Sequence, residues 1–224
     1  MIGYKAGHCA DEVLCNVMIG RCAGFCTVCG TTCQGDTNVY IGNEAAKHAT
    51  TAFENIVIGD RTVGNGAMTG KRNIIMGWEA ACNFTSGEYN VFFGTSAAGD
   101  ATTGKSNVAL GPFAGRKLST GCWNTFVGAY SGYGNASSGG TGHYNTALGV
   151  TAICSLQGGE HNIGIGHWSG KVLTSGGENI FIGRSAGDNV TTGSKNIAIG
   201  CNVELASATG SSQMIIGNGT SWWI

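Results

Sequence analysis

A five-residue pattern of polar and apolar positions recurs from one end of the chain to the other. The pattern is Asn-φ-x-φ-Gly, where φ is an apolar residue and x is variable; eleven copies begin with Asn, and a twelfth begins with Gln213. The closing glycines, from Gly3 to Gly217, are seventeen residues apart in nine of twelve intervals. A fixed period of this kind is typical of solenoid proteins, in which each repeat forms one rung and is stabilised by stacking on its neighbours.

Each copy of the pattern predicts a short β-strand. β-Branched and aromatic residues between turn formers indicate strands, whereas three to four glycines per rung would cost about 1 kcal/mol each inside a helix. Two extended segments and two tight turns fit the seventeen residues. We therefore expect an all-β solenoid, a β-roll or β-helix of about thirteen rungs, stacked at roughly 4.8 Å. The three longer intervals predict insertions near residues 25–35, 62–70 and 133–142, which form loops on the flank of a solenoid.

Alternation along a strand assigns the two faces of the predicted sheet. The two φ positions are almost all aliphatic or aromatic, so we expect them to form the core of the solenoid. The middle position then faces outward, yet it carries no charged residue in any copy. An exposed apolar stripe of this length exceeds what soluble monomers tolerate, which predicts burial against other copies of the chain. The members of this predicted oligomer stripe are Tyr40, Val57, Ile75, Phe92, Phe126, Phe181 and Ile215.

Composition narrows the class of protein. The chain has 40 glycines but one proline and no Gly-X-Y period, which excludes collagen, while 42% hydrophobic and 11% charged residues exclude a solvated disordered chain. A net charge of −1 with dispersed basic residues predicts no nucleic-acid partner. The absence of an eighteen-residue apolar run predicts no membrane insertion. We expect one repeat domain over 1–224, with Cys-rich rungs at 1–36, regular rungs at 37–217 and a tail at 218–224.

The repeated Asn and Gly residues are interpreted as structural. Asn amides stacked in register hydrogen-bond along a ladder and close turns, and the glycines fit positive φ or a close approach of rungs. The histidines occupy different phases of the repeat, and Asp and Glu are few and dispersed. We therefore expect no enzymatic activity, no metal and no cofactor.

Cysteines are concentrated near the N-terminus. Cys9 and Cys26 both follow their phased glycine by six residues in adjacent rungs, which predicts a disulfide between them. The alternative is a zinc site, formed by a run of four cysteines that lacks a paired ligand set at a standard spacing. Confirmed disulfides would indicate an oxidising, extracellular setting. Further disulfide candidates are Cys15, Cys22, Cys29 and Cys33, and the possible zinc ligands are Cys22, Cys26, Cys29 and Cys33.

Two further features of the sequence predict binding, one to a receptor or glycan and one between copies of the chain. Rings cluster in the sequence around the insertion at 133–142, where aromatic loops on a rigid scaffold suit carbohydrate stacking; alternatively, these rings pack the loop or the subunit interface. The chain ends near Trp222 and Trp223, which with the N-terminal cysteines could join copies end to end into a filament. The members of the predicted receptor or glycan patch are Trp123, Tyr130, Tyr133, His143 and Tyr144.

The repeat Asn-φ-x-φ-Gly-x-x-Ala-Gly…Thr-Gly, as in Asn107–Gly115 through Thr120-Gly121, resembles the repeats of phage and other viral tail-fibre proteins. More distantly it is similar to the head repeats of trimeric autotransporter adhesins. The resemblance implies a homotrimeric shaft or attachment element, on a virion or outside a cell, with a host-surface glycan or receptor as partner. The end-to-end filament subunit is the alternative function.

Overall fold

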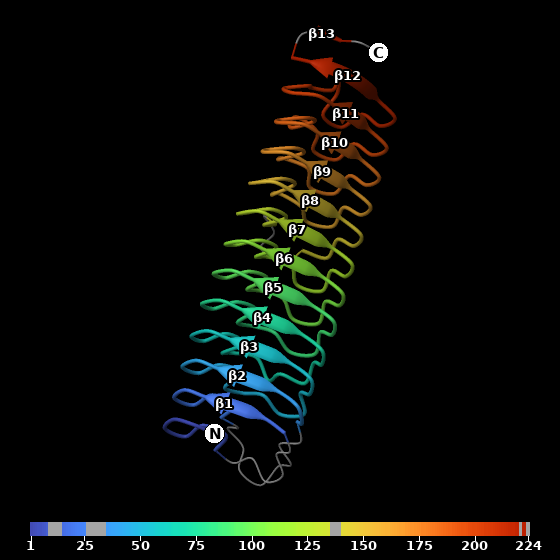
Figure 1. Ribbon diagram of the computed structural model, residues 1–224. Coiled ribbons are helices and arrows are strands. Elements are labelled where there is room, and N and C mark those ends of the chain that lie inside the picture. Colours follow the sequence, from blue (N-terminus) through green and yellow to red (C-terminus); the bar gives the residue numbers. More distant parts are fainter. Residues whose placement is uncertain (9–14, 26–34, 135–139, 220, 223–224) are drawn as a thin grey trace.

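The chain forms one elongated stack of rungs. The computed structural model describes residues 1–8, 15–25, 35–134, 140–219 and 221–222. Strands β1 to β12 follow one another along the stack in sequence order, as Figure 1 shows. The strands are β1 (Val17–Ile19), β2 (Val39–Ile41), β3 (Ile56–Ile58), β4 (Ile74–Met76), β5 (Val91–Phe93), β6 (Val108–Leu110), β7 (Thr125–Val127), β8 (Thr146–Leu148), β9 (Ile163–Ile165), β10 (Ile180–Ile182), β11 (Ile197–Ile199), β12 (Met214–Asn218) and β13 (Ser221–Trp222).

All twelve repeat strands pair in parallel and in register. Val57 of β3, for example, faces Ile75 of β4, which in turn faces Phe92 of β5. Ile2 adds a parallel bridge to Ile19 below the first strand. The predicted β-solenoid with a seventeen-residue repeat is therefore confirmed.

The second extended segment expected in each rung is not a strand in the described residues. Within the regular rungs it is reduced to two isolated parallel bridges, Phe53 to Lys71 and Leu118 to Gly140. The remainder of each rung is turns and bends that still hydrogen-bond to the next rung through the backbone; Thr85 N, for instance, donates to Thr102 O at 3.0 Å.

The glycine that ends each strand is required by the stacking. Gly94 has a φ of +139°, and a Cβ at this position would lie 2.5 Å from the carbonyl oxygen of Gly111 in the next rung. Only glycine tolerates both the backbone conformation and this approach. The chain then turns through two left-handed residues, Ser96 and Ala98.

The Asn residues form a continuous buried ladder, as the sequence predicted. The Asn90 backbone N and Nδ2 both donate to Oδ1 of Asn73, at 3.0 Å, and Asn90 Oδ1 accepts the same pair of bonds from Asn107. Asn90 Nδ2 also donates to the carbonyl oxygens of Glu88 and Gly104. Every polar atom of the buried amide is thus paired, which is the condition for a stable buried polar network.

The core contains one strand side chain per rung, packed against residues of the returning chain that range from glycine and alanine to Phe84 and Leu173. Phe126 is 1% exposed, and a Cβ on Gly132 would lie 2.5 Å from its ring. Where the strand itself supplies a glycine, Gly164, the large side chain of Ile153 fills the space. In these two rungs a large residue on one side of the interior is therefore matched by a small one on the other.

The one-residue insertion at 62–70 is absorbed within the rung. The backbone N atoms of Asn65 and Gly66 both donate to the Cys82 carbonyl oxygen, and Met68 is fully buried. This insertion therefore contributes to the core in addition to lengthening a turn. The other two insertions lie partly outside the described residues.

Candidate functional site

The outward face of the sheet is a long apolar surface of the described chain. It carries the first and third residues of the strands, so that two columns of apolar side chains run along β1 to β12. Eleven spacings of roughly 4.8 Å make this face about 50 Å long. Phe93 is 54% exposed, and the other exposed members are Val17, Ile19, Ile56, Ile74, Ile163, Ile165, Ile182 and Met214.

This arrangement corrects the predicted oligomer stripe, because the middle strand position faces inward. Ile215 is half-buried against the core, and the other predicted members are buried inside the chain itself: Tyr40, Val57, Ile75, Phe92, Phe126 and Phe181. The physical reason lies in the Asn ladder. Asn is buried, and the middle position follows it by two residues, so alternation places both on the inner face. The first and third positions, expected in the core, therefore point outward.

A second surface column follows the residue immediately before each ladder Asn. These residues have left-handed backbones: φ is 58° at Arg72 and 57° at Trp123. Their backbone N atoms donate to a carbonyl oxygen of the preceding rung, as Trp123 N does to Lys105 O at 3.0 Å. The turn thus holds each of these residues at one edge of the cross-section. We call this set the turn column: Cys15, Thr37, Glu54, Arg72, Tyr89, Ser106, Trp123, Tyr144, His161, Glu178, Lys195 and Ser212.

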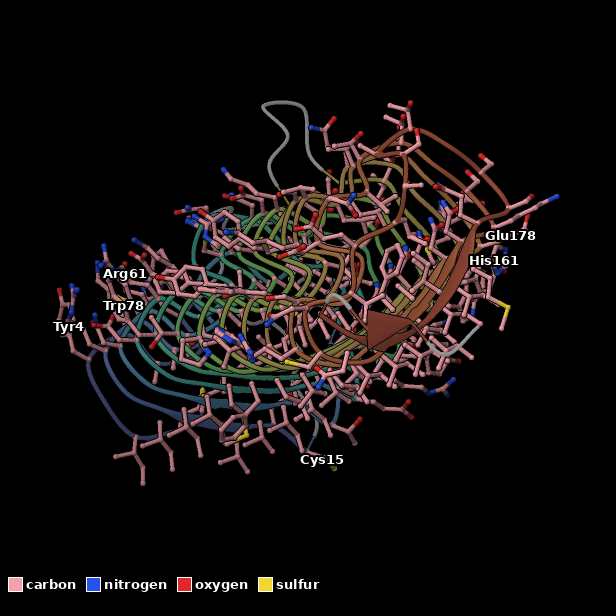
Figure 2. All side chains as sticks on the ribbon, turned by 90° about the horizontal axis from the view of Figure 1, so that it is seen from above. Tyr4, Cys15, Arg61, Trp78, His161 and Glu178 are labelled. Carbon is pink, nitrogen blue, oxygen red and sulfur yellow. The ribbon has the colours of Figure 1, made fainter. Side chains whose placement is uncertain are left out.

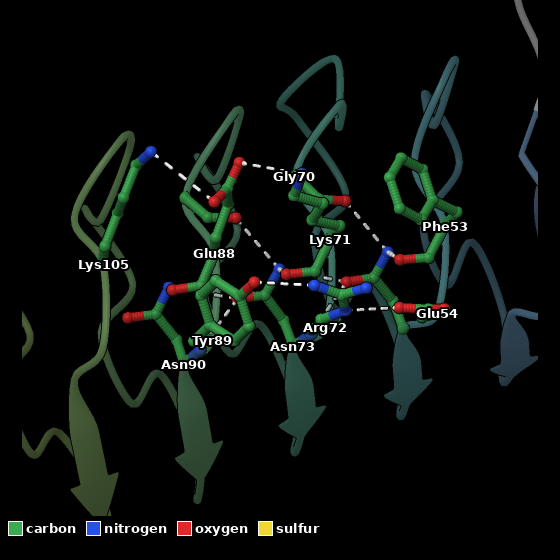
Figure 3. A network of polar contacts seen from close by, with 12 residues as sticks. Phe53, Glu54, Gly70, Lys71, Arg72, Asn73, Glu88, Tyr89, Asn90 and Lys105 are labelled. Atoms are coloured by element: carbon green, nitrogen blue, oxygen red, sulfur yellow. Dashed lines mark hydrogen bonds and ion pairs between the residues drawn. The ribbon is translucent and has the colours of Figure 1, made fainter.

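The part of the turn column nearer the N-terminus is ionic. Arg72 Nε donates to Glu54 Oε2 at 2.5 Å, and Arg72 Nη1 donates to the Tyr89 hydroxyl at 2.7 Å. Beside it, Glu88 lies between Lys71 and Lys105, with N–O distances of 3.8 and 3.6 Å. Figure 3 shows these contacts crossing from rung to rung. Exposed pairs of this kind contribute little stability, because solvent screens the charges.

The next part of the turn column is aromatic. The Trp123 and Tyr144 rings lie 5.0 Å apart between centroids, with 2° between their planes, and Tyr144 and His161 lie 4.7 Å apart with 7°. Three rings therefore stack at the rung spacing. Ser106 precedes them in the column, and Glu178 follows them.

The structure divides the predicted receptor patch between two edges. Trp123 and Tyr144 belong to the turn column, with His143 beside Tyr144. Tyr130 and Tyr133 follow the strand, in the region where Tyr130 stacks on Phe113 at 5.0 Å. In Figure 2, His161 and Glu178 mark one end of the cross-section, and Tyr4, Arg61 and Trp78 lie at the opposite end. His161 and Phe113 were missed as partners, although each lies seventeen residues from the ring it stacks on.

The predicted cysteine chemistry falls mostly outside the described residues. Cys9, Cys26, Cys29 and Cys33 lie there, so the Cys9–Cys26 disulfide and the zinc alternative remain predictions. Cys15 is an exposed free thiol. Cys22 is a buried free thiol, so neither of these two disulfide candidates is bonded here. Within the described part of the chain, no group of three or more His, Cys, Asp or Glu is placed to hold a metal ion.

The C-terminal end of the stack is partly covered by the chain itself. β13 pairs antiparallel with β12, Gly217 opposite Trp222 and Asn218 opposite Ser221. Of the predicted end-to-end joint, the Trp222 backbone is thus engaged within the chain, and Trp223 lies outside the described residues. The described part of the chain contains no helix long and apolar enough to cross a membrane.

The fold and these surfaces define the chain as a parallel β-solenoid repeat protein. Compared with protein-family models, curated protein sequences and solved structures, the chain shows no significant match.

Proposed function

We propose that the chain is a structural and adhesive fibre element that acts outside the cell or on a virion surface, without enzymatic activity. The single observation that carries this proposal is the outward face of the sheet. Two columns about 6.7 Å apart, widened by their side chains to roughly 12 Å, give a projected area of about 600 Å² over 50 Å. That is the upper end for the largest apolar patch of a monomer and approaches the roughly 800 Å² that each partner buries in a stable interface.

The occupant of this face is a second copy of the chain, arranged in parallel. A partner with the same rung spacing brings its side chains into register along the whole length, and closed cyclic symmetry leaves no copy with an open face. We expect a parallel homotrimer, the stoichiometry implied by the resemblance to tail-fibre and adhesin repeats. The end-to-end filament is the less favoured alternative, because β13 already pairs with part of the edge of β12.

The test is the molecular mass of the full chain in solution, measured by analytical ultracentrifugation. The wild type is expected at three times the chain mass, and replacement of two outward residues, Phe93→Lys and Ile165→Lys, is expected to give monomers. The control is Trp78→Lys, because Trp78 is 45% exposed but lies at the edge. A wild type that is monomeric at micromolar concentration, or a double variant with unchanged mass, would overturn the proposal.

A further inference from the structure

The turn column contains an aromatic ring with one open face. One face of the Trp123 indole is covered by Tyr144, which is backed in turn by His161. Toward the preceding rung the same column carries Ser106, whose side chain is a single hydroxymethyl group. Trp123 is 52% exposed. Within the described chain its ring has one ring partner, Tyr144, and no cation lies over it.

The space above Ser106 has the thickness of one rung. A ring placed there would lie about 4.8 Å from the Trp123 plane, close to the separations at which Tyr144 and His161 continue the stack. A flat nucleobase stacks more tightly than this spacing, and the net charge of −1 offers no attraction for a phosphate backbone. A saturated sugar ring is thicker, and its C–H face suits an indole face.

Polar groups that can bind sugar hydroxyls lie on the two rungs that precede Trp123. Ser106 contributes its hydroxyl. Lys105, whose side chain is 50% exposed, lies on the rung before Trp123 and forms an ion pair at 3.6 Å with Glu88, which is one rung further away. Figure 3 shows this ion pair, with Glu88 next to Tyr89. An apolar platform with a few convergent donors and acceptors is the usual composition of a small-ligand site.

We propose that Trp123, together with the notch at Ser106, binds a pyranose ring of a neutral polysaccharide. The sugar stacks on the open indole face and takes the place that a large side chain at position 106 would occupy. This proposal deepens the adhesive part of the proposed function and rests on it, because it names the partner class as a glycan.

The column itself supplies the sharpest variant. Ser106→Trp puts a ring into the notch at a backbone position where tryptophan is already tolerated, since Trp123 has the same left-handed conformation. This variant fills the site without removing any residue of it. Trp123→Ala removes the platform.

The matched control is Trp168→Ala. Trp168 is also exposed and left-handed, but its ring is occupied by His167, at 4.2 Å, and by the Lys171 ammonium, at 5.0 Å. Loss of a tryptophan here is expected to leave binding unchanged.

The experiment is affinity electrophoresis of the full chain in gels containing a β-glucan, a xylan, a mannan or a galactan. At least one polysaccharide is expected to retard the wild type and Trp168→Ala, with affinity reduced about tenfold or more in Trp123→Ala and Ser106→Trp. Retardation of Ser106→Trp equal to that of the wild type would overturn the site, as would a wild type retarded by none of the four. Neither result changes the masses measured by sedimentation. The glycan site and the fibre proposal are therefore tested independently of each other.

Discussion

Phe92 and Phe93 are adjacent in strand β5, and their side chains lie in opposite environments. Phe92 is fully buried in the chain's own core, and its ring meets the ring of Phe84 edge to face at 6.0 Å. Phe93 is 54% exposed on the outward face. The two faces of the sheet are similarly apolar, but the inner face is already packed by the rung that carries it. The outer face is left for another molecule, so hydrophobicity alone does not identify the core of a solenoid.

The largest expected effect is the difference in stability between alanine variants of these two phenylalanines. Phe92→Ala leaves a cavity in a rigid, close-packed interior and should lower the free energy of unfolding by about 3–5 kcal/mol. Phe93→Ala should change the stability of the dissociated chain by less than about 1 kcal/mol and weaken self-association instead. Urea unfolding at several protein concentrations measures both effects. Equal losses for the two variants in dissociated chains would contradict the assignment of faces.

The buried ladder gives the next largest effect. Asn90→Ala removes the acceptor of two bonds from Asn107 and a donor to Gly104, and should lower the free energy of unfolding by roughly 3 kcal/mol. The control is Gln213→Ala at the end of the ladder, where the side chain is half-buried and its Nε2 bonds to Ser207 and Gly210. Thermal unfolding should show the smaller loss for Gln213→Ala. A loss at Asn90 no greater than at Gln213 would mean that the amide ladder contributes little.

Removing the hydroxyl group from two tyrosines, one buried in the core and one exposed, extends this comparison. For the buried tyrosine we expect a gain in stability, not a loss. The Tyr40 hydroxyl is buried, has no hydrogen-bond partner in the described chain, and has a pKa that burial raises above its usual value. Tyr40→Phe removes an unsatisfied polar atom and should raise the free energy of unfolding by about 1 kcal/mol. Tyr89→Phe loses the bond from Arg72 at an exposed site and should be neutral or slightly destabilising. Lower stability in Tyr40→Phe would reveal a partner for the hydroxyl.

The smallest expected effect is a change in thermal stability with pH that depends on Asp100. Burial raises the pKa of Asp100, but hydrogen bonds from Lys117 and Arg116 outweigh it and hold the pKa below its usual value. A depressed pKa contributes stability above the unfolded value, about 4, that is lost as the pH falls through the folded value. The melting temperature of the wild type should therefore approach that of Asp100→Asn between pH 4 and pH 2. A constant difference across this range would exclude a charged role for Asp100.

Much of the fold could be predicted because the repeat is recognisable from the sequence alone. The spacing of Asn and Gly gives the rung, the strand and the buried amide ladder, since each follows from residues recurring in register. Which strand residues point into the core could not be assigned from hydrophobicity or side-chain size, because both faces of the sheet are apolar. The Asn residues would have allowed the assignment. Asn73 and Ile75 are two residues apart, so a buried Asn73 places Ile75 on the same, inner face of the sheet.

The candidate sites were less predictable, because nearness in sequence differs from nearness across rungs. Trp123 and Tyr130 are close in the chain, but strand β7 lies between them and carries them to opposite edges. Trp123, Tyr144 and His161 are far apart in the chain, and the stacking brings them together. Only the phase within the repeat predicts which residues share an edge.

The parallel register also determines how the molecule responds to tension. Hydrogen bonds between rungs run along the long axis, so a pull on the two chain ends opens the bonds of a terminal junction one after another. Once a terminal rung detaches, its seventeen residues extend to about 58 Å while the next junction takes up the load. The stack would therefore lengthen in steps of similar size under force, with larger steps at the rungs that carry insertions, releasing one rung at a time and absorbing mechanical work at each step.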